Sequence, residues 1–129
     1  MQFSKFVSLS ITALKSNFST LQKPFKLNFA VTYWCNSRCL TCNIWQLKPK
    51  NELSIDEINA FAEKNNYFKW VELTGGEPFL RSDIVEIAKA FAENMKDLYL
   101  LTMPTNSLLN HEILLSKIES IAKLGIPRF

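Results

Sequence analysis

The first part of the chain places apolar residues at the spacing of a helix. These residues are Phe3, Phe6, Val7, Ile11, Leu14, Phe18 and Leu21. The pattern predicts an amphipathic helix that ends before Pro24. A signal peptide is disfavoured, because the stretch "FVSLSITAL" is rich in hydroxyl groups and no small-residue cleavage site follows it. Contact of the apolar face with a membrane surface is the alternative, although only Lys5 and Lys15 would support it.

Three later stretches of apolar and β-branched residues predict buried strands. They cover residues 27–32, 69–73 and 98–103. A helical pattern follows each of them, with apolar faces at 55–62, 84–95 and 110–124. Residues 126–129 read as the start of a fourth strand. Because strands and helices alternate every roughly 30 to 40 residues, we expect parallel strands joined by right-handed crossovers and an α/β fold.

Capping residues support the predicted helix boundaries. Ser54 and Glu57 form a capping box ahead of the first of these helices. Asp83 and Glu86 offer a cap for the next one. Gly125 stands where the last helix is expected to end.

Composition narrows the classes of protein to consider. The chain has 129 residues, of which 47% are hydrophobic and 21% charged, a balance that suits one small globular domain with a core. Its net charge of +3 comes from basic residues scattered among acidic ones, so we expect no nucleic-acid partner. No apolar run approaches the roughly 20 residues that span a bilayer. An odd number of cysteines without a secretion signal predicts a reducing, cytoplasmic location.

All three cysteines lie in the stretch "WCNSRCLTCNIW", directly after the first predicted strand, at Cys35, Cys39 and Cys42. A Cys39–Cys42 disulfide or redox pair would leave Cys35 unused. A zinc site would need a fourth ligand, and the sole histidine, His111, lies far along the chain. Three incidental buried cysteines are a further alternative. An iron–sulfur cubane held by three thiolates fits the spacing better, and it would leave one iron open to a small molecule.

A second motif, "LTGGEPFLR", follows the second predicted strand. Gly75 and Gly76 lack side chains, so their backbone can approach a ligand closely. Glu77 adds a carboxylate and Pro78 stiffens the turn, which would suit a cationic group such as an α-amino group. An ordinary strand–helix turn is the alternative. The position favours a ligand site, because both motifs follow strands at the edge where β/α barrels bind their ligands.

Together the two motifs resemble the radical S-adenosylmethionine (radical SAM) superfamily, over residues of about 27 to 109. The resemblance implies that Cys35, Cys39 and Cys42 hold a [4Fe-4S] cluster, whose fourth iron binds S-adenosylmethionine. It also implies that Gly75, Gly76, Glu77 and Pro78 line the site of the methionyl amino group. One-electron reduction would then produce a 5′-deoxyadenosyl radical that abstracts hydrogen from a substrate.

The chain departs from the family pattern at two places. Thr41 stands where many members carry an aromatic residue before the third cysteine. The segment after the third strand often reads T-N-G in the family, whereas Thr105 and Asn106 are followed here by Ser107. Asn106 is therefore read either as a site residue or as a plain turn residue. The catalytic residues stay unknown.

The resemblance also implies an architecture. Residues 1–26 would be a helical lead-in, and residues 27–129 would form about three of the six β–α units of a partial (β/α) barrel, truncated at the start of strand 4. We therefore expect a fragment of an enzyme rather than a complete one or a half-barrel with a partner chain. An electron donor such as flavodoxin or ferredoxin is expected, and the substrate is open between a peptide and a small molecule. A non-catalytic iron–sulfur, zinc or electron-transfer module is the alternative.

Three further expectations concern single side chains. The tryptophans Trp34, Trp45 and Trp70 are expected in the core rather than at a cofactor. Glu72 points either into a barrel interior or to solvent at an edge of the sheet. His111 is expected on the surface, at the start of a helix.

Overall fold

A three-stranded parallel sheet forms the centre of the computed structural model, which describes residues 2–129. Its strands are β1 (Lys26–Thr32), β2 (Trp70–Gly75) and β3 (Leu100–Thr102), in the order β1-β2-β3. Lys26, Trp70 and Leu100 lie side by side in the register. Arg128 forms a parallel bridge with Leu100, so the chain begins to pair along the outer edge of β3, where the sequence predicts a fourth strand.

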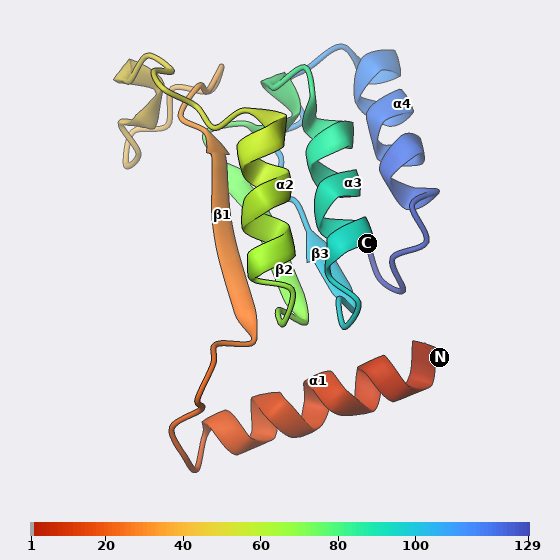
Figure 1. The fold of residues 1–129 in the computed structure, drawn as a ribbon. Coiled ribbons are helices and arrows are strands. Elements are labelled where there is room, and N and C mark those ends of the chain that lie inside the picture. Colours follow the sequence, from red (N-terminus) through yellow and green to blue (C-terminus); the bar gives the residue numbers. More distant parts are fainter. Residues whose placement is uncertain (1) are drawn as a thin grey trace.

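Three helices cover one face of this sheet (Figure 1). They are α2 (Ile55–Lys64), α3 (Ile84–Asn94) and α4 (His111–Ala122), and each follows one strand. Two 3₁₀ turns, η1 (Ile44–Gln46) and η2 (Pro78–Leu80), lie in the connections after β1 and β2. The alternation is that of a β/α barrel, and the chain forms a part of one.

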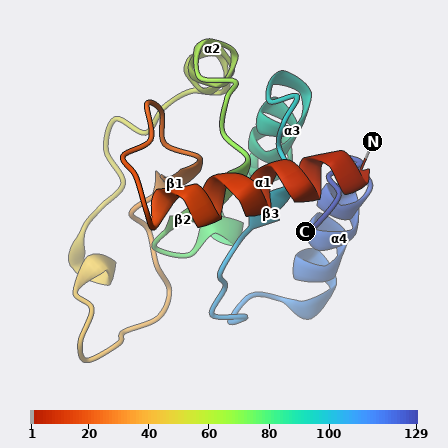
Figure 2. The same ribbon diagram turned by 90° about the horizontal axis from the view of Figure 1, so that it is seen from below.

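The first helix, α1 (Gln2–Ser16), crosses beneath the edge of the sheet at which the strands begin (Figures 1 and 2). Polar contacts attach it there. Lys69 Nζ donates to the hydroxyls of Ser8 and Thr12 at 2.8 Å, and Lys5 Nζ donates to the Leu98 carbonyl at 3.3 Å. No residue of Gln2–Ser16 is buried, and the apolar side chains Phe3 and Leu14 are exposed. The helix therefore contacts the rest of the fold through these hydrogen bonds and through the ring contact of Phe6 with Tyr99, and none of its residues is fully buried.

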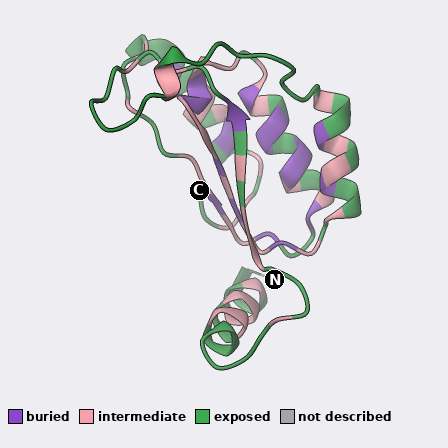
Figure 3. Cartoon of the chain, turned by 90° about the vertical axis from the view of Figure 1, so that its left-hand side faces the viewer, coloured by how far each residue is buried: buried purple, intermediate pink, exposed green. Residues whose placement is uncertain are grey.

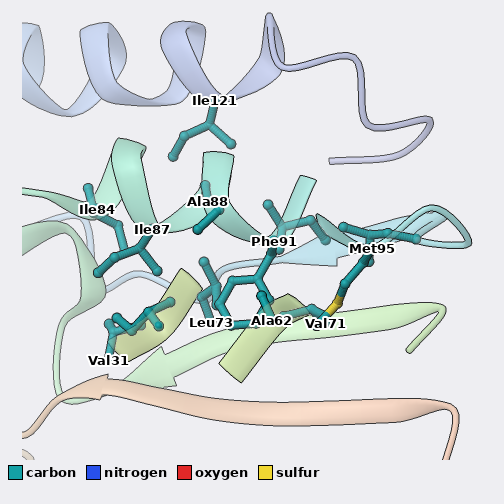
Figure 4. Packing of buried hydrophobic residues seen from close by; sticks show 14 of the residues in the cluster. Val31, Ala62, Val71, Leu73, Ile84, Ile87, Ala88, Phe91, Met95 and Ile121 are labelled. Atoms are coloured by element: carbon teal, nitrogen blue, oxygen red, sulfur yellow. The ribbon is translucent and has the colours of Figure 1, made fainter. Parts of the chain in front are cut away.

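The core lies between the sheet and the three covering helices (Figure 4). Val71 and Leu73 of β2 point into it and meet Ile87 and Phe91 of α3, all fully buried. Because side chains alternate along a strand, the residues between them point to the other face, which carries no helix. Burial is accordingly concentrated on the helix side of the sheet, while the connection after β1 and helix α1 are largely exposed (Figure 3).

Several boundaries differ from the predicted ones. Strand β2 continues to Gly75 instead of ending at residue 73, and β3 covers only three residues of the predicted 98–103. The capping box of Ser54 and Glu57 is present. Asp83 stands at the N-cap of α3 as predicted, but its side chain makes no cap hydrogen bond. Asn110 caps the last helix through its side chain. The tryptophans were predicted wrongly as well. Trp34 is exposed and the other two are half-buried.

Among residues 2–129, no helix is long and apolar enough to cross a membrane.

Candidate functional site

Three connections meet at the edge of the sheet where the strands end (Figure 1). The connection after β1 carries the three cysteines at residues 35–42, and we call these residues the cysteine loop. Strand β2 ends in the turn Gly75–Pro78, and β3 leads into residues 103–110. In parallel α/β sheets this edge is where ligands bind, because each strand delivers its following loop there.

The three thiols are free and accessible. Cys35 is half-buried, whereas Cys39 and Cys42 are exposed, which contradicts the alternative of three incidental buried cysteines. Ser37 connects two of them: its backbone N–H donates to Cys35 Sγ at 3.4 Å, and its hydroxyl lies 3.3 Å from Cys39 Sγ. The backbone N–H of Cys42 donates to the Cys39 carbonyl at 3.4 Å.

The donor set of the site consists of three thiols on one loop. Within residues 2–129, no three side chains of cysteine, histidine, aspartate or glutamate converge as the ligands of one ion would. His111 lies at the exposed start of α4, as predicted. A cubane distributes its thiolate ligands over three different irons, so those ligands need not converge on one point. Three free thiols on one accessible loop are a donor set that a cubane with one open iron could use.

The glycine pair lies directly against the cysteine loop. The N–H of Gly76 donates to the Thr32 carbonyl and that of Glu77 donates to the Trp34 carbonyl, both at 2.8 Å. A Cβ atom on Gly76 would lie 2.1 Å from the Trp34 carbonyl oxygen and 3.1 Å from Cys35 Cβ. A Cβ on Gly75, whose φ is +129°, would lie 2.1 Å from the Thr32 oxygen. The two glycines are thus required by the close approach of two backbone segments.

The carboxylate of Glu77 is buried, with 1% of the residue exposed. Its Oε1 accepts the backbone N–H of Phe79 at 3.1 Å, and its Oε2 accepts the backbone N–H of Asn106 at 2.7 Å. The first bond caps η2, which begins at Pro78. The second bond joins this turn to the connection after β3. Glu77 therefore holds two of the three loops together.

Asn106 reaches the cysteine loop from the connection after β3. Its Nδ2 lies 3.7 Å from Cys35 Sγ and donates to Asn36 Oδ1 at 2.8 Å. The following residue, Ser107, has a φ of +58°, which is uncommon for a residue with a side chain. The sequence left Asn106 open between a site residue and a turn residue, and the structure places it beside Cys35.

Arg81 is a residue of the site that sequence reasoning missed. Its guanidinium donates to the Val31 carbonyl at 2.6 Å and to the Leu53 carbonyl, so it joins the end of β1 to the segment that returns from the cysteine loop. It also pairs with Asp83, where its hydrogen bond holds the pKa of that carboxyl below its usual value. The only hint in the sequence is the arginine that ends "GGEPFLR".

Lys117 of α4 supports the same region from the helix side. Its ammonium group donates to the carbonyls of Phe79 and Arg81, at 2.8 and 3.0 Å. Burial lowers the pKa of this lysine. Two cationic side chains thus satisfy backbone carbonyls around η2. Arg81 binds those of Val31 and Leu53, and Lys117 binds those of Phe79 and Arg81.

Glu72 lies on the face of the sheet that carries no helix. In a β/α barrel this face is the interior, which is one of the two orientations predicted for Glu72. Lys26 Nζ is 3.1 Å from its carboxylate, and the Thr102 hydroxyl is 3.4 Å away. Trp70 Nε1 donates to that hydroxyl at 3.0 Å, and the Lys26 ammonium lies 3.9 Å from the Trp70 ring centre. Glu72 also lines an open hollow of about 760 Å³ beside β3. The group is polar, but each of its members already has a partner.

The sequence and the fold of the chain are similar to those of known proteins. A family model described as the radical SAM superfamily matches residues 29–129. The chain is 34% identical over 108 residues to the GTP 3',8-cyclase of Listeria welshimeri, a match that covers 79% of this chain and 31% of that protein. It is 42% identical over 82 residues to the GTP 3',8-cyclase of Pectobacterium atrosepticum, covering 57% of this chain and 24% of that one. The chain therefore spans about a third or less of the length of these curated relatives.

Two solved structures share the fold. Streptococcus suis SuiB bound to S-adenosylmethionine superposes with a TM-score of 0.64 at 24% identity, covering 88% of this chain and 25% of that one. BtrN in an open conformation superposes with a TM-score of 0.63 at 17% identity, covering 82% of this chain and 49% of that one. At these identities the likeness concerns the fold.

Proposed function

Because the chain belongs to the radical SAM superfamily, we propose that Cys35, Cys39 and Cys42 hold a [4Fe-4S] cluster and that Gly75–Pro78 receives S-adenosylmethionine beside it. The observation that carries this proposal is the contact between the two motifs. They lie about 40 residues apart in the sequence, yet a Cβ on Gly76 would nearly touch the Cβ of Cys35. A ligand of the open iron would therefore also lie against the glycine turn.

The residues of the chain have distinct roles in this proposal. A cluster held by these cysteines would supply the one electron that cleaves S-adenosylmethionine reductively to a 5′-deoxyadenosyl radical, and that radical would abstract hydrogen from a substrate. The cysteines ligate three irons, and Ser37 holds two of the thiols in place through its contacts with Cys35 and Cys39. Gly75 and Gly76 allow the turn to lie close to Cys35, so that the backbone of Gly75–Pro78 lines the amino-group site.

The structure refines the proposed role of Glu77. Its carboxylate is buried and accepts two backbone N–H groups. We therefore assign the contact with the amino group to the backbone of the turn, and we assign to the Glu77 side chain the task of fixing that backbone. Pro78, also buried, starts η2 and limits the freedom of the turn.

For the whole protein we propose hydrogen abstraction from a substrate, with a flavodoxin- or ferredoxin-type protein as electron donor. The named relatives act as GTP 3',8-cyclases, and the SuiB structures contain S-adenosylmethionine or a precursor peptide. We therefore retain both proposed substrate classes for this chain, a small molecule and a peptide. The exposed side of the cysteine loop, where Leu40 is 100% exposed, leaves the proposed cluster accessible to a donor.

The test is anaerobic reconstitution with iron and sulfide, followed by iron analysis and by EPR of the reduced protein with and without S-adenosylmethionine. Each of Cys35→Ala, Cys39→Ala and Cys42→Ala should lower the iron content sharply. Leu40→Ala is the matched control, because this exposed residue lies between two of the ligands and should leave the iron content unchanged.

The outcomes separate the proposal from its alternatives. A cluster whose EPR spectrum changes when S-adenosylmethionine is added supports it. Stoichiometric zinc without iron would contradict the cluster assignment. A cluster whose EPR spectrum does not change on addition of S-adenosylmethionine would favour a non-catalytic electron-transfer module.

A further inference from the structure

Asn106 joins three segments that are distant in the sequence. Its backbone N–H donates to the buried Glu77 carboxylate, and its side-chain Nδ2 contacts Cys35 Sγ and Asn36 Oδ1. Cys35 and Asn106 are 71 residues apart. A plain turn residue would need none of these contacts, so the arrangement indicates a specific task for this side chain.

The surrounding hydrogen bonds determine which way the Asn106 amide points. Its Oδ1 accepts the backbone N–H of Leu108 at 2.9 Å, so the other end of the amide, the NH₂ group, faces the cysteine loop. The Asn36 amide is oriented in the same way, because its Nδ2 donates to the Leu108 carbonyl at 3.0 Å and leaves Oδ1 toward Asn106. If the Asn106 amide were reversed, its NH₂ group would face the backbone N–H of Leu108, and two donors would meet without an acceptor. The group beside Cys35 Sγ is therefore a donor.

Cys35 thus receives N–H donors from two different sources. The Ser37 N–H belongs to the cysteine loop and moves with it. The Asn106 N–H comes from the connection after β3, and its backbone is tied to Glu77. This second donor is therefore fixed through its backbone to the turn that we assign to the cosubstrate, and through Asn36 to the cysteine loop.

Hydrogen bonds to the sulfurs of an iron–sulfur cluster stabilise the more negative, reduced state, and so they raise the reduction potential. We propose that Asn106 is a positioning residue that holds Cys35 and raises the reduction potential of the cluster through its side-chain N–H. This inference rests on the proposed function, because it requires Cys35 to be a cluster ligand. The backbone bond between Asn106 and Glu77 makes that potential sensitive to the geometry of the Gly75–Pro78 turn.

Three variants test this. Asn106→Ala removes the donor. Asn106→Asp keeps an acceptor for the Leu108 N–H, so the turn is retained, but it replaces the donor by a carboxylate oxygen. Asn36→Ala is the matched control, because it removes the contacts of Asn36 with Asn106 and Leu108 but neither of the two N–H donors to Cys35. For each protein we would measure the apo melting temperature, the iron content after reconstitution and the midpoint potential by EPR-monitored dithionite titration.

We expect Asn106→Ala to lower the equilibrium constant for one-electron reduction about tenfold, which is about 59 mV toward more negative potential. Asn106→Asp should shift the potential further in the same direction, because it adds a negative charge. Asn36→Ala should leave it unchanged. Selective loss of iron from folded Asn106 variants, with Asn36→Ala still loaded, would also support the inference.

The inference is overturned if both Asn106 variants keep the potential of the unmodified chain, or if Asn36→Ala shifts it as much as Asn106→Ala does. In those cases the proposed function stands, because the unmodified chain still carries its cluster. An unmodified chain that takes up no iron would instead refute the proposed function, and this inference with it.

Discussion

Replacing Gly76 by alanine tests whether the glycine turn and the cysteine loop behave as one unit. The added Cβ would lie 2.1 Å from the Trp34 carbonyl oxygen and 2.6 Å from its carbon. Both are backbone atoms, so no side chain can rotate away. The oxygen would have to move by at least about 0.9 Å to reach 3.0 Å, which is the shortest separation that real Cβ atoms show.

That movement has a calculable cost. It would disturb the hydrogen bonds from Gly76 N–H to Thr32 and from Glu77 N–H to Trp34, both now 2.8 Å long. Each contributes about 0.5–1.5 kcal/mol, and overpacking in a close contact costs about 1–3 kcal/mol. We therefore expect Gly76→Ala to lower the free energy of unfolding by about 2–6 kcal/mol. This is a large part of the roughly 5–15 kcal/mol that keeps a typical domain folded.

Urea unfolding of the apo protein measures this loss, with Gly125→Ala as the control. A Cβ on Gly125 would meet nothing within 4 Å, so only its φ of +76° would cost stability, at about 1–2 kcal/mol. Reconstitution adds a second measurement: iron content should fall in Gly76→Ala and stay unchanged in Gly125→Ala. If Gly76→Ala costs no more than Gly125→Ala and binds iron normally, the close contact does not hold the cysteine loop in place.

Three other predictions follow from the site. Glu77→Gln should lower the free energy of unfolding of the apo protein by about 1–3 kcal/mol, because an amide offers only one oxygen to the two backbone N–H donors; urea unfolding at neutral pH measures it. Asp83 has a lowered pKa in the folded protein, chiefly through its hydrogen bond with Arg81. The ionised carboxylate therefore stabilises the folded state fully above the unfolded pKa of about 3.9, and this contribution is lost as the pH falls through the lower folded value. The difference in unfolding free energy between the unmodified chain and Asp83→Asn should therefore shrink below about pH 4, and a pH-independent difference would contradict this. Ser107→Gly should raise the free energy of unfolding by up to about 1 kcal/mol, because glycine adopts a φ of +58° without strain; a clear loss in urea unfolding would show that the serine side chain is needed there.

The order of the elements could be predicted because it depends on local periodicity. The apolar spacing of residues 84–95 leaves little choice but a helix with one buried face, and α3 forms there with Ile87 and Phe91 fully buried. The end of β3 could not be predicted in this way. Residues 98–103 are apolar enough for a strand, but ladder pairing with β2 reaches only from Leu100 to Thr102. Pairing partners decide the length of a strand, and they lie elsewhere in the sequence.

Capping and burial failed for a similar reason. Asp83 is a good capping residue by type, but in the structure its carboxylate pairs with Arg81 instead. The tryptophans were predicted in the core rather than at a cofactor. Trp70 instead points to the face without helices, where Lys26 lies over its ring. Successive side chains of a strand point to opposite faces of the sheet. Because Val71 and Leu73 face the helices, Trp70 must face the other side.

The glycine pair shows how a motif can be recognised while its physical reason is misread. From the sequence, the missing side chains of Gly75 and Gly76 indicated room for a ligand to approach the backbone. In the structure, the space above Gly76 is occupied by the Trp34 carbonyl, and Cys35 lies immediately behind it. A side chain at Gly76 would therefore press against the Trp34 backbone and the first cysteine. The cluster loop and the cosubstrate turn are packed backbone to backbone, and a perturbation of one is therefore expected to change the other.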